Sequence, residues 1–330
     1  MVLTEIFAAV PVIAQSWMKS MATDAPDELK MDDGTVSCIP ASDCHVSKHS
    51  PSTIGSDKNG NGERWCGVLN TCYKTNGVIK DDDPRVHMKL SRSDEWVQPK
   101  NIADFFTVIR TTLEKGKMYR LIAGNTGSGV YPPANAQTTI DITALPLYKC
   151  SIEGDTLKLG GCIPLAKMID FLRTLDSDQF AYAEPIAKHL SRVANTPIRN
   201  RATPAGNLML KYLHPEFPSD MFTILESIGT KIEIASINDV NGSTLIPICN
   251  LLDTNVSMKG KILTSLILPK LSGQEYRYHS YKISKRYQNA HAYVNAGFLI
   301  KLDTEFNIIE KPKLCFGGIS KSFVSPLIVS

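Results

Sequence analysis

The chain has 330 residues, of which 43% are hydrophobic, so it can bury the cores of more than one domain. Its 36 basic and 33 acidic residues leave a net charge of +3 and no basic stripe of the kind that nucleic acids demand. No apolar run approaches the roughly 20 residues of a membrane span, and the scattered cysteines do not form a disulfide scaffold, which favours a reducing, cytoplasmic compartment.

The first part of the chain gives few signs of regular structure. The apolar stretch IFAAVPVIA follows an acidic rather than a basic residue and contains Pro11, so it does not predict a secretory signal. Residues 24–93 are rich in Asp, Ser, Gly, Asn and Lys, which predicts a linker. The early cysteines stand too far apart within each pair for a zinc site, and no metal is expected at Cys38, Cys44, Cys66 and Cys72.

A helix–strand–loop–strand unit is predicted next. Residues 101–115 place Ile102, Phe105, Phe106 and Ile109 on one helical face, and Gly116 follows as a stop. The stretch MYRLIA and the residues 140–142 then predict two strands. This order indicates a small parallel unit, with the intervening loop at the carboxyl end of its first strand, where ligands usually bind in α/β sheets.

That loop, within LIAGNTGSGVY at residues 121–131, is dense in glycine. Glycine marks a backbone that turns tightly or closely approaches something else, because it adopts positive φ without steric cost. The stretch lacks the Gly-Lys-Ser/Thr ending of a nucleoside-triphosphate loop, and its glycines do not fit the usual dinucleotide fingerprint. By itself the pattern favours a plain turn after a strand over a phosphate site.

The remaining chain mixes helices and strands. The pattern predicts helices near 164–175, 181–194 and 219–228, a glycine-bearing segment at 202–210, strands at 230–236, 244–249 and 262–268, and antiparallel strands from Tyr276 onward. This is an α+β chain of at least two units.

A second candidate anion site lies in RATPAGNLMLKYLHPEFPSD. Gly206 and Asn207 open an apolar helical run and are expected to offer free backbone N–H groups to a phosphate, with the Thr203 hydroxyl beside them. Asp220 begins the next helix, where the simpler interpretation of Ser219 and Asp220 is an N-cap. Two separate cradles indicate a diphosphate held from both sides, with Asp220 free to accept from sugar hydroxyls, as in a dinucleotide cofactor site.

Five ordered motifs resemble the flavin-binding portion of the molybdenum hydroxylases, and most closely that of insect aldehyde oxidases, which are relatives of xanthine dehydrogenase. The motifs are RLIAGNTGSGVY, LGGCIPLAKMIDFL, ANTPIRNRATPAGNLMLK with HPEFPSDMFTILE, KISKRYQNAHAYVNAGF, and KPKLCFGGI. The resemblance implies a PCMH-type, vanillyl-alcohol-oxidase-like FAD-binding fold at residues 85–270, with α/β subdomains at 85–145 and 146–270. It further implies a residual segment following an iron–sulfur domain, with a linker, at 1–84, and the incomplete start of a C-terminal flavoprotein domain at 271–330.

The resemblance also implies the cofactors and the residues that hold them. In the family a molybdenum centre oxidises an aldehyde or heterocycle, two [2Fe-2S] clusters relay the electrons, and FAD delivers them to an acceptor. This chain resembles only the FAD-binding portion. It is therefore expected to bind FAD, to carry no catalytic or metal-binding residue, and to be unable to oxidise aldehydes alone. The intact enzyme would be a homodimer that contains the iron–sulfur and molybdenum domains. The positions that match FAD contacts are Leu121, Ile122, Ala123, Gly124, Asn125, Thr126, Gly127, Ser128, Thr203, Asp220, Leu263 and Lys282.

Several assignments keep an alternative. Lys282 would stabilise reduced flavin if it lies beside the ring, but is otherwise an exposed strand residue. His291 and Asn295 match the family motif and are equally suited to holding strands together. Tyr131 is a further candidate for contact with the flavin ring.

The electron acceptor is inferred from a segment in which this chain differs from the NAD-using relatives. NAD-using relatives carry an aromatic-rich Phe-Phe-Pro-Gly-Tyr-Arg stretch where this chain has LDTNVSMKG, so no ring is available to stack on nicotinamide. Molecular oxygen is the expected acceptor. The alternatives are an NAD-linked xanthine dehydrogenase-type module and a truncated, non-catalytic relic.

Overall fold

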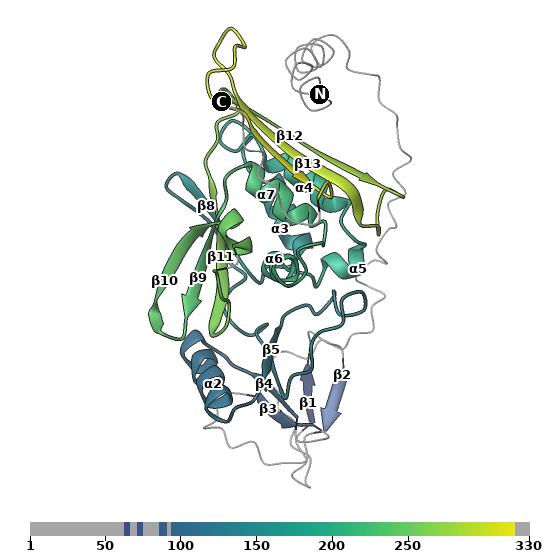
Figure 1. The fold of residues 1–330 in the computed structure, drawn as a ribbon, viewed down its shortest axis with the longest axis vertical. Coiled ribbons are helices and arrows are strands. Elements are labelled where there is room, and N and C mark those ends of the chain that lie inside the picture. Colours follow the sequence, from purple (N-terminus) through teal and green to yellow (C-terminus); the bar gives the residue numbers. More distant parts are fainter. Residues whose placement is uncertain (1–62, 67–70, 75–85, 91–93, 254, 321–330) are drawn as a thin grey trace, which may run out of the picture. The chain divides into compact units, whose positions relative to one another are not determined.

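The structure, a computed structural model, describes residues 63–66, 71–74, 86–90, 94–253 and 255–320 (Figure 1). The chain divides into two compact units, Met1–Val78 and Ile79–Ser330. In the first unit, β1 (Glu63–Cys66) and β2 (Thr71–Lys74) form an antiparallel hairpin. The sequence did not predict these two strands. The stretch IFAAVPVIA, Cys38 and Cys44 lie outside the described residues.

A four-stranded sheet opens the second unit, in the order β3-β4-β6-β5. Its strands are β3 (Val86–Lys89), β4 (Glu95–Gln98), β5 (Tyr119–Ile122) and β6 (Thr138–Asp141). β6 pairs in parallel with both β4 and β5, which confirms the predicted parallel unit, while β3 adds an antiparallel edge inside the segment predicted as linker.

Helix α2 (Ile102–Glu114) connects β4 to β5 and packs on this sheet. Asn101 caps the helix by accepting a hydrogen bond from the Asp104 amide, and the chain leaves it through Gly116 at φ +66°. Phe105, Phe106 and Ile109 are buried against Val97 and Ile140 of the strands. The periodic apolar face of the sequence is thus the face that forms the core.

A five-stranded antiparallel sheet follows, in the order β10-β9-β11-β8-β7. Its strands are β7 (Cys150–Glu153), β8 (Thr156–Gly160), β9 (Lys231–Ser236), β10 (Asp239–Pro247) and β11 (Lys261–Pro269), and the short 3-10 helix η2 (Ile248–Leu252) follows β10. The central strand β11 places Leu266 opposite both Leu159 and Ile232, and all three side chains are buried.

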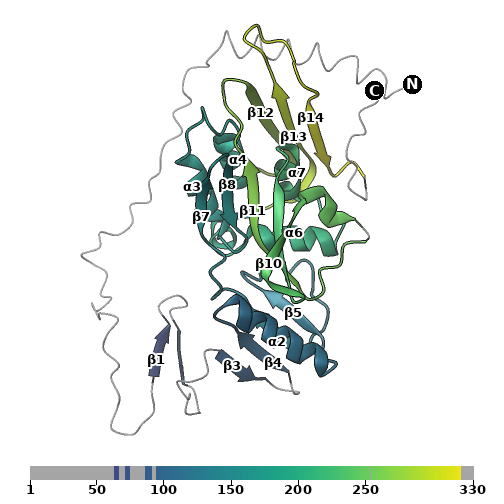
Figure 2. The same cartoon turned by 90° about the vertical axis from the view of Figure 1, so that its left-hand side faces the viewer.

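Helices fill the connection between β8 and β9 (Figures 1 and 2). They are α3 (Leu165–Arg173), α4 (Ala183–Ser191), α5 (Thr196–Arg199), α6 (Pro204–Leu213) and α7 (Asp220–Ser227). The apolar faces of α3, α4, α6 and α7 form one core with β8, β9 and β11. The three predicted helices are confirmed, and most of the glycine-bearing segment predicted at 202–210 is the helix α6.

The described chain ends in an antiparallel sheet of β12 (Tyr276–Ser284), β13 (Ala292–Lys301) and β14 (Lys313–Gly317), as its alternating sequence predicts. One face of this sheet packs on α7 and α4. The approach is close, because a Cβ added at Gly297 would overlap the Ser227 hydroxyl of α7. The mixed helix and sheet architecture confirms the α+β prediction. Among the described residues, no helix is long and apolar enough to span a bilayer.

Candidate functional site

The glycine loop leaves the sheet directly after β5. The Ile142 amide donates to the Ile122 carbonyl at 2.9 Å, and beyond this point the loop departs from the ladder. Asn125 adopts φ 52°, in the left-handed region that asparagine tolerates better than most residues. The amides of Val130 and Tyr131 donate to the Gly127 carbonyl at 3.0 and 2.9 Å, which closes the loop with a turn.

The backbone donors of this loop are unused. Within the described part of the chain, no amide of residues 123–129 donates a hydrogen bond to the protein. The same residues are half-buried or exposed, so a ligand can reach them. Successive backbone N–H groups that have no protein acceptor and that a ligand can reach form a site for an anion.

Close backbone contact fixes where the loop lies. A Cβ added at Gly124 would overlap the Arg201 carbonyl oxygen and lie 2.5 Å from its carbon, so the loop touches the connection between α5 and α6. A Cβ added at Gly127 would lie 3.4 Å from the Leu210 side chain of α6. The structure therefore brings the two predicted cradle segments together.

The start of α6, however, has no free donors. Pro204 has no amide hydrogen, the Ala205 amide donates to the Gly161 carbonyl at 3.0 Å, and the Gly206 amide donates to Thr203 Oγ1 at 3.1 Å. The Asn207 amide donates to the Thr203 carbonyl at 3.0 Å, as the helical pattern requires. The prediction of free N–H groups at Gly206 and Asn207 is wrong, because Thr203 serves as the N-cap.

The side chain of Asn207 is also engaged by the protein. Its Oδ1 accepts a hydrogen bond from Ser219 Oγ at 2.5 Å, which ties α6 to the N-cap of α7. Ser219 in turn caps α7 by accepting from the Phe222 amide at 3.0 Å, as the simpler sequence interpretation predicted.

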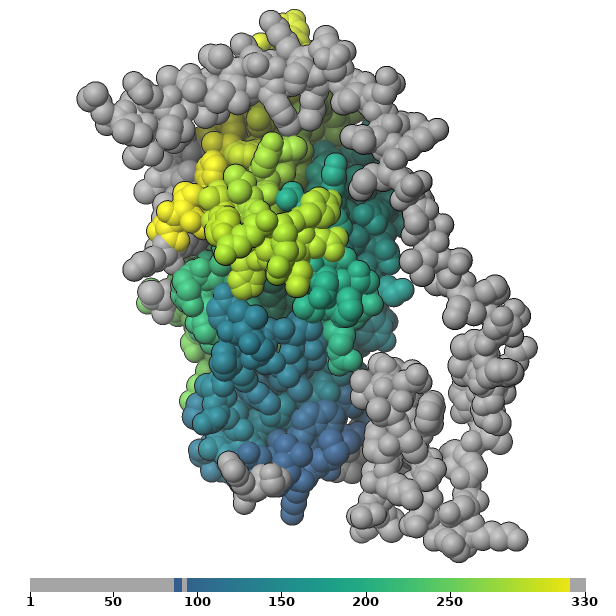
Figure 3. Space-filling view, turned by 90° about the vertical axis from the view of Figure 1, so that its right-hand side faces the viewer, coloured from purple at the N-terminus to yellow at the C-terminus, as the bar shows by residue number. Residues whose placement is uncertain are grey.

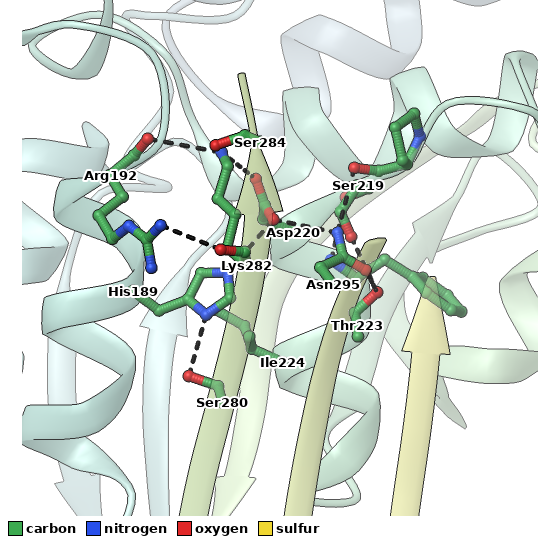
Figure 4. Close-up of polar contacts among 12 residues, drawn as sticks. His189, Arg192, Ser219, Asp220, Thr223, Ile224, Ser280, Lys282, Ser284 and Asn295 are labelled. Carbon is green, nitrogen blue, oxygen red and sulfur yellow. Dashed lines mark hydrogen bonds and ion pairs between the residues drawn. The ribbon is translucent and has the colours of Figure 1, made fainter. Parts of the chain in front are cut away.

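Asp220 lies in a buried polar network rather than in open space (Figure 4). Its side chain is 7% exposed, and Oδ2 pairs with Lys282 Nζ at 2.7 Å. Oδ1 accepts from Asn295 Nδ2 at 3.0 Å and lies 3.2 Å from His189 Nε2. The prediction that Asp220 is free to accept from sugar hydroxyls is wrong, because a buried carboxylate needs partners and both its oxygens have them.

The network keeps Asp220 ionised. Burial pushes the pKa of this carboxyl upward, but the hydrogen bond and charge of His189 and the charge and hydrogen bond of Lys282 outweigh it and hold the pKa below its ordinary value. Lys282 is 4% exposed in β12, so it is not an exposed strand residue. The ion pair joins the β12–β14 sheet to α7.

Asn295 and His189 complete the network (Figure 4). Asn295 is fully buried, and its Oδ1 accepts from Thr223 Oγ1 at 2.8 Å. His189 Nδ1 lies 2.9 Å from Ser280 Oγ. His189 was not predicted from the sequence, although its position in α4, one turn after Ile186 and beside Leu190, placed it on the apolar face of that helix.

The remaining predicted site residues lie in or beside these elements. Leu121 and Ile122 are the last residues of β5, and the side chain of Leu263 in β11 is buried in the core. Among the described residues, no cluster of His, Cys, Asp and Glu could hold a metal ion.

Comparison with protein families gives two matches. The family described as "FAD binding domain in molybdopterin dehydrogenase" matches residues 89–271, and the "CO dehydrogenase flavoprotein C-terminal domain" matches residues 279–327. The resemblance read from the five motifs is thereby confirmed. The free amides of residues 123–129 and the bare backbone at Gly124 suit the diphosphate of FAD, which needs donors at close range.

Curated relatives include aldehyde oxidases of plants. The chain is 26% identical over 231 residues to "Probable aldehyde oxidase 1" of Oryza sativa subsp. japonica, a match that covers 68% of this chain and 17% of the relative. It is 28% identical over 228 residues to "Indole-3-acetaldehyde oxidase" of Zea mays, covering 68% and 16%. The chain thus spans about a sixth of the length of these relatives.

Solved structures share the fold. A carbon monoxide dehydrogenase from Hydrogenophaga pseudoflava superposes with a TM-score of 0.58 at 14% identity, covering 71% of this chain and 78% of the other. Quinoline 2-oxidoreductase from Pseudomonas putida 86 gives 0.55 at 18% identity, covering 71% and 76%. With a matching family over residues 89–271 and this shared architecture, the chain belongs to the family of FAD binding domains found in molybdopterin dehydrogenases.

Proposed function

We propose that this chain is the flavin-bearing, electron-transferring portion of an aldehyde oxidase-like molybdenum hydroxylase. The observation that carries the proposal is the run of unused amides at residues 123–129, which lies against α6 and the connection that precedes it. A dianionic diphosphate is the part of FAD that such donors suit. The contacts of Leu121, Ile122, Thr203 and Leu263 with the cofactor belong to the same proposal.

The chain supplies binding and orientation. FAD, when bound, accepts and passes on electrons, which is chemistry that no side chain of this chain provides. The glycine loop holds the diphosphate, and Gly124 lets the loop backbone lie directly on the backbone of Arg201. The Asp220–Lys282 ion pair holds β12 and α7 in a fixed relation beside this region, and its charges offset one another.

The electron source and the cellular setting are part of the proposal. The chain spans about a sixth of its curated relatives. The oxidation of an aldehyde would therefore take place in a molybdenum domain and the electrons would pass through an iron–sulfur domain, both of which accompany this portion in a longer, homodimeric, cytoplasmic protein. The division into subdomains at 85–145 and 146–270, with a C-terminal flavoprotein domain from 271, belongs to the same proposal.

Molecular oxygen is the proposed acceptor. The segment LDTNVSMKG, which begins at the last residue of η2 and leads to β11, has no aromatic ring that could stack on nicotinamide. To test this, the flavin-loaded chain is reduced with dithionite without air and mixed with either oxygenated buffer or NAD+. We expect oxygen to restore the flavin spectrum and NAD+ to leave it bleached. Rapid flavin reduction by NADH would instead support an NAD-linked module.

Cofactor binding itself is tested on the purified full chain. The chain is incubated with FAD, separated from free ligand by gel filtration, and examined by visible absorbance. We expect bound flavin, displacement by ADP, which carries the diphosphate, and much weaker binding of riboflavin, which lacks it. A protein that stays colourless after this treatment, or that binds riboflavin as tightly as FAD, contradicts the proposal.

A further inference from the structure

Four aromatic rings from three separate segments meet just beyond the glycine loop. The Tyr131 ring lies 4.7 Å from that of His214, 5.5 Å from that of Phe217 and 6.0 Å from that of His291, measured between centroids. His214 and Phe217 belong to the connection between α6 and α7, and His291 directly precedes β13. These residues are called here the Tyr131 cluster.

The cluster is a closed arrangement rather than a chain of contacts. Phe217 also meets His291 edge-on, with centroids 5.4 Å apart, and Phe217 is buried. Tyr131 and His291 are nearly parallel, at an interplanar angle of 17°. In Figure 3 the yellow-green part of the chain, which includes the β12–β13 connection, rests on the blue part, which includes the glycine loop.

Tyr131 is linked directly to the loop backbone. Its amide donates to the Gly127 carbonyl at 2.9 Å, so a shift of Tyr131 moves Gly127. The loop amides make no hydrogen bonds of their own to the described protein, so contacts from neighbouring segments must hold its shape. Gly124 lies against Arg201 and Gly127 lies near Leu210, and the Tyr131 ring provides a further contact at the far end of the loop.

We infer that Tyr131 is a positioning residue for the diphosphate of FAD. Its ring, held by His214, Phe217 and His291, fixes the far end of the loop so that the amides of residues 123–129 stay arranged to donate together. This inference rests on the proposed function, because it requires that the loop binds the diphosphate. It assigns Tyr131 a role through the loop rather than contact with the flavin ring.

Two observations place this role in the ring and not in the hydroxyl group. Among the described residues, the Tyr131 hydroxyl has no hydrogen-bond partner. Burial, and then the charge of Glu216, raise the pKa of Tyr131, so the phenol brings no negative charge toward a bound diphosphate at neutral pH. A phenylalanine should therefore serve at this position.

The test compares Tyr131→Ala with Tyr131→Phe in the full chain, by equilibrium titration with FAD, ADP and riboflavin. Loss of the ring contacts should weaken FAD and ADP alike by about tenfold, the usual scale for aromatic pairs. Tyr131→Phe should bind both as the unchanged chain does, and the weak binding of riboflavin should not change. The matched control is Tyr148→Ala, since Tyr148 is 55% exposed and has no ring contact among the described residues.

A second variant guards against misfolding of Tyr131→Ala. His291→Ala removes only an exposed member of the cluster and should weaken FAD and ADP in the same direction by a smaller factor. Unchanged FAD affinity in both alanine variants overturns the inference, as does a loss in Tyr131→Phe equal to that in Tyr131→Ala. If the unchanged chain binds neither FAD nor ADP, the proposed function itself fails, and the inference fails with it.

Discussion

The glycine loop and the start of α6 look alike in sequence but differ in what their backbone can offer. Both are small, glycine-bearing segments beside an apolar run, and both were predicted as anion cradles. In the structure the amides of residues 123–129 are unused, whereas every amide at the start of α6 already has an acceptor or is absent. A glycine three residues after a threonine, with proline between them, indicates a capped helix, since the hydroxyl takes the amide that a ligand would need.

The difference divides the region into a part that binds and a part that stabilises. The α6–α7 side is satisfied by its own caps, by Asn207 and by the Asp220 network. The loop side is satisfied by no protein acceptor among the described residues. Substitutions on the first side should therefore lower the free energy of unfolding, and substitutions in the loop should lower FAD affinity.

The largest effect is expected from Lys282→Met. It removes the cation paired with Asp220 and leaves a buried carboxylate without its closest charge, which should reduce the free energy of unfolding by about 3–5 kcal/mol. Urea unfolding of the full chain measures it. Lys301→Met is the matched control, because Lys301 pairs with a carboxylate that is mostly exposed and should matter little. Equal stability of the two variants would contradict the buried network.

The next effect is expected from Gly124→Ala. The new methyl group would overlap the Arg201 carbonyl, so the loop must shift, and FAD affinity should fall by an equivalent of about 1–3 kcal/mol. Gly129→Ala is the control in the same loop, where an added Cβ meets nothing within 4 Å. Fluorescence titration with FAD separates the two. Equal affinities would show that the contact at Gly124 does not shape the site.

A smaller effect is expected from Thr203→Ala. Loss of the N-cap should reduce the free energy of unfolding by about 1 kcal/mol, and Thr203→Ser, which keeps the hydroxyl, should restore it. FAD affinity should fall by less than in Gly124→Ala, because the Thr203 hydroxyl already accepts from the Gly206 amide. If Thr203→Ala instead weakens FAD as much as Gly124→Ala does, the hydroxyl serves the cofactor rather than the helix.

The smallest effect is expected on how stability depends on pH, and it appears only at acid pH. Because the pKa of Asp220 is lowered in the folded protein, its stabilising contribution is complete above the ordinary carboxyl value of about 3.9 and is lost as the pH falls through the lowered value. Unfolding measured from pH 6 downward should therefore show a shallower acid loss in Asp220→Asn, with the other carboxylates retaining the rest. Identical acid slopes would contradict the assignment.

Local patterns were enough to predict much of the fold. The spacing of Phe105, Phe106 and Ile109 predicted α2, and alternation predicted β12 and β13, because the same apolar positions face the core. The strands between residues 63 and 89 could not be predicted, since they lie in polar sequence and owe their form to pairing with partners.

The site was only partly predictable for the same reason. The glycine loop could be located, because glycine density and the end of a strand are local signals. The partners of Asp220 come from α4, β12 and β13, and nothing near Asp220 in sequence indicates that His189 or Lys282 would reach it. In contrast, the hydrogen bond from the Gly206 amide to Thr203 could have been predicted from the sequence, because Thr203 followed by Pro204 is typical of a capped helix start.

Hydrogen exchange at single-amide resolution tests the central claim most directly. The amides of residues 123–129 should exchange rapidly in the free chain and become strongly protected when FAD or ADP is added, while the amides of Ala205, Gly206 and Asn207 should be protected already and change little. If FAD is retained but protects only the start of α6, or protects neither segment, the glycine loop is not the diphosphate site.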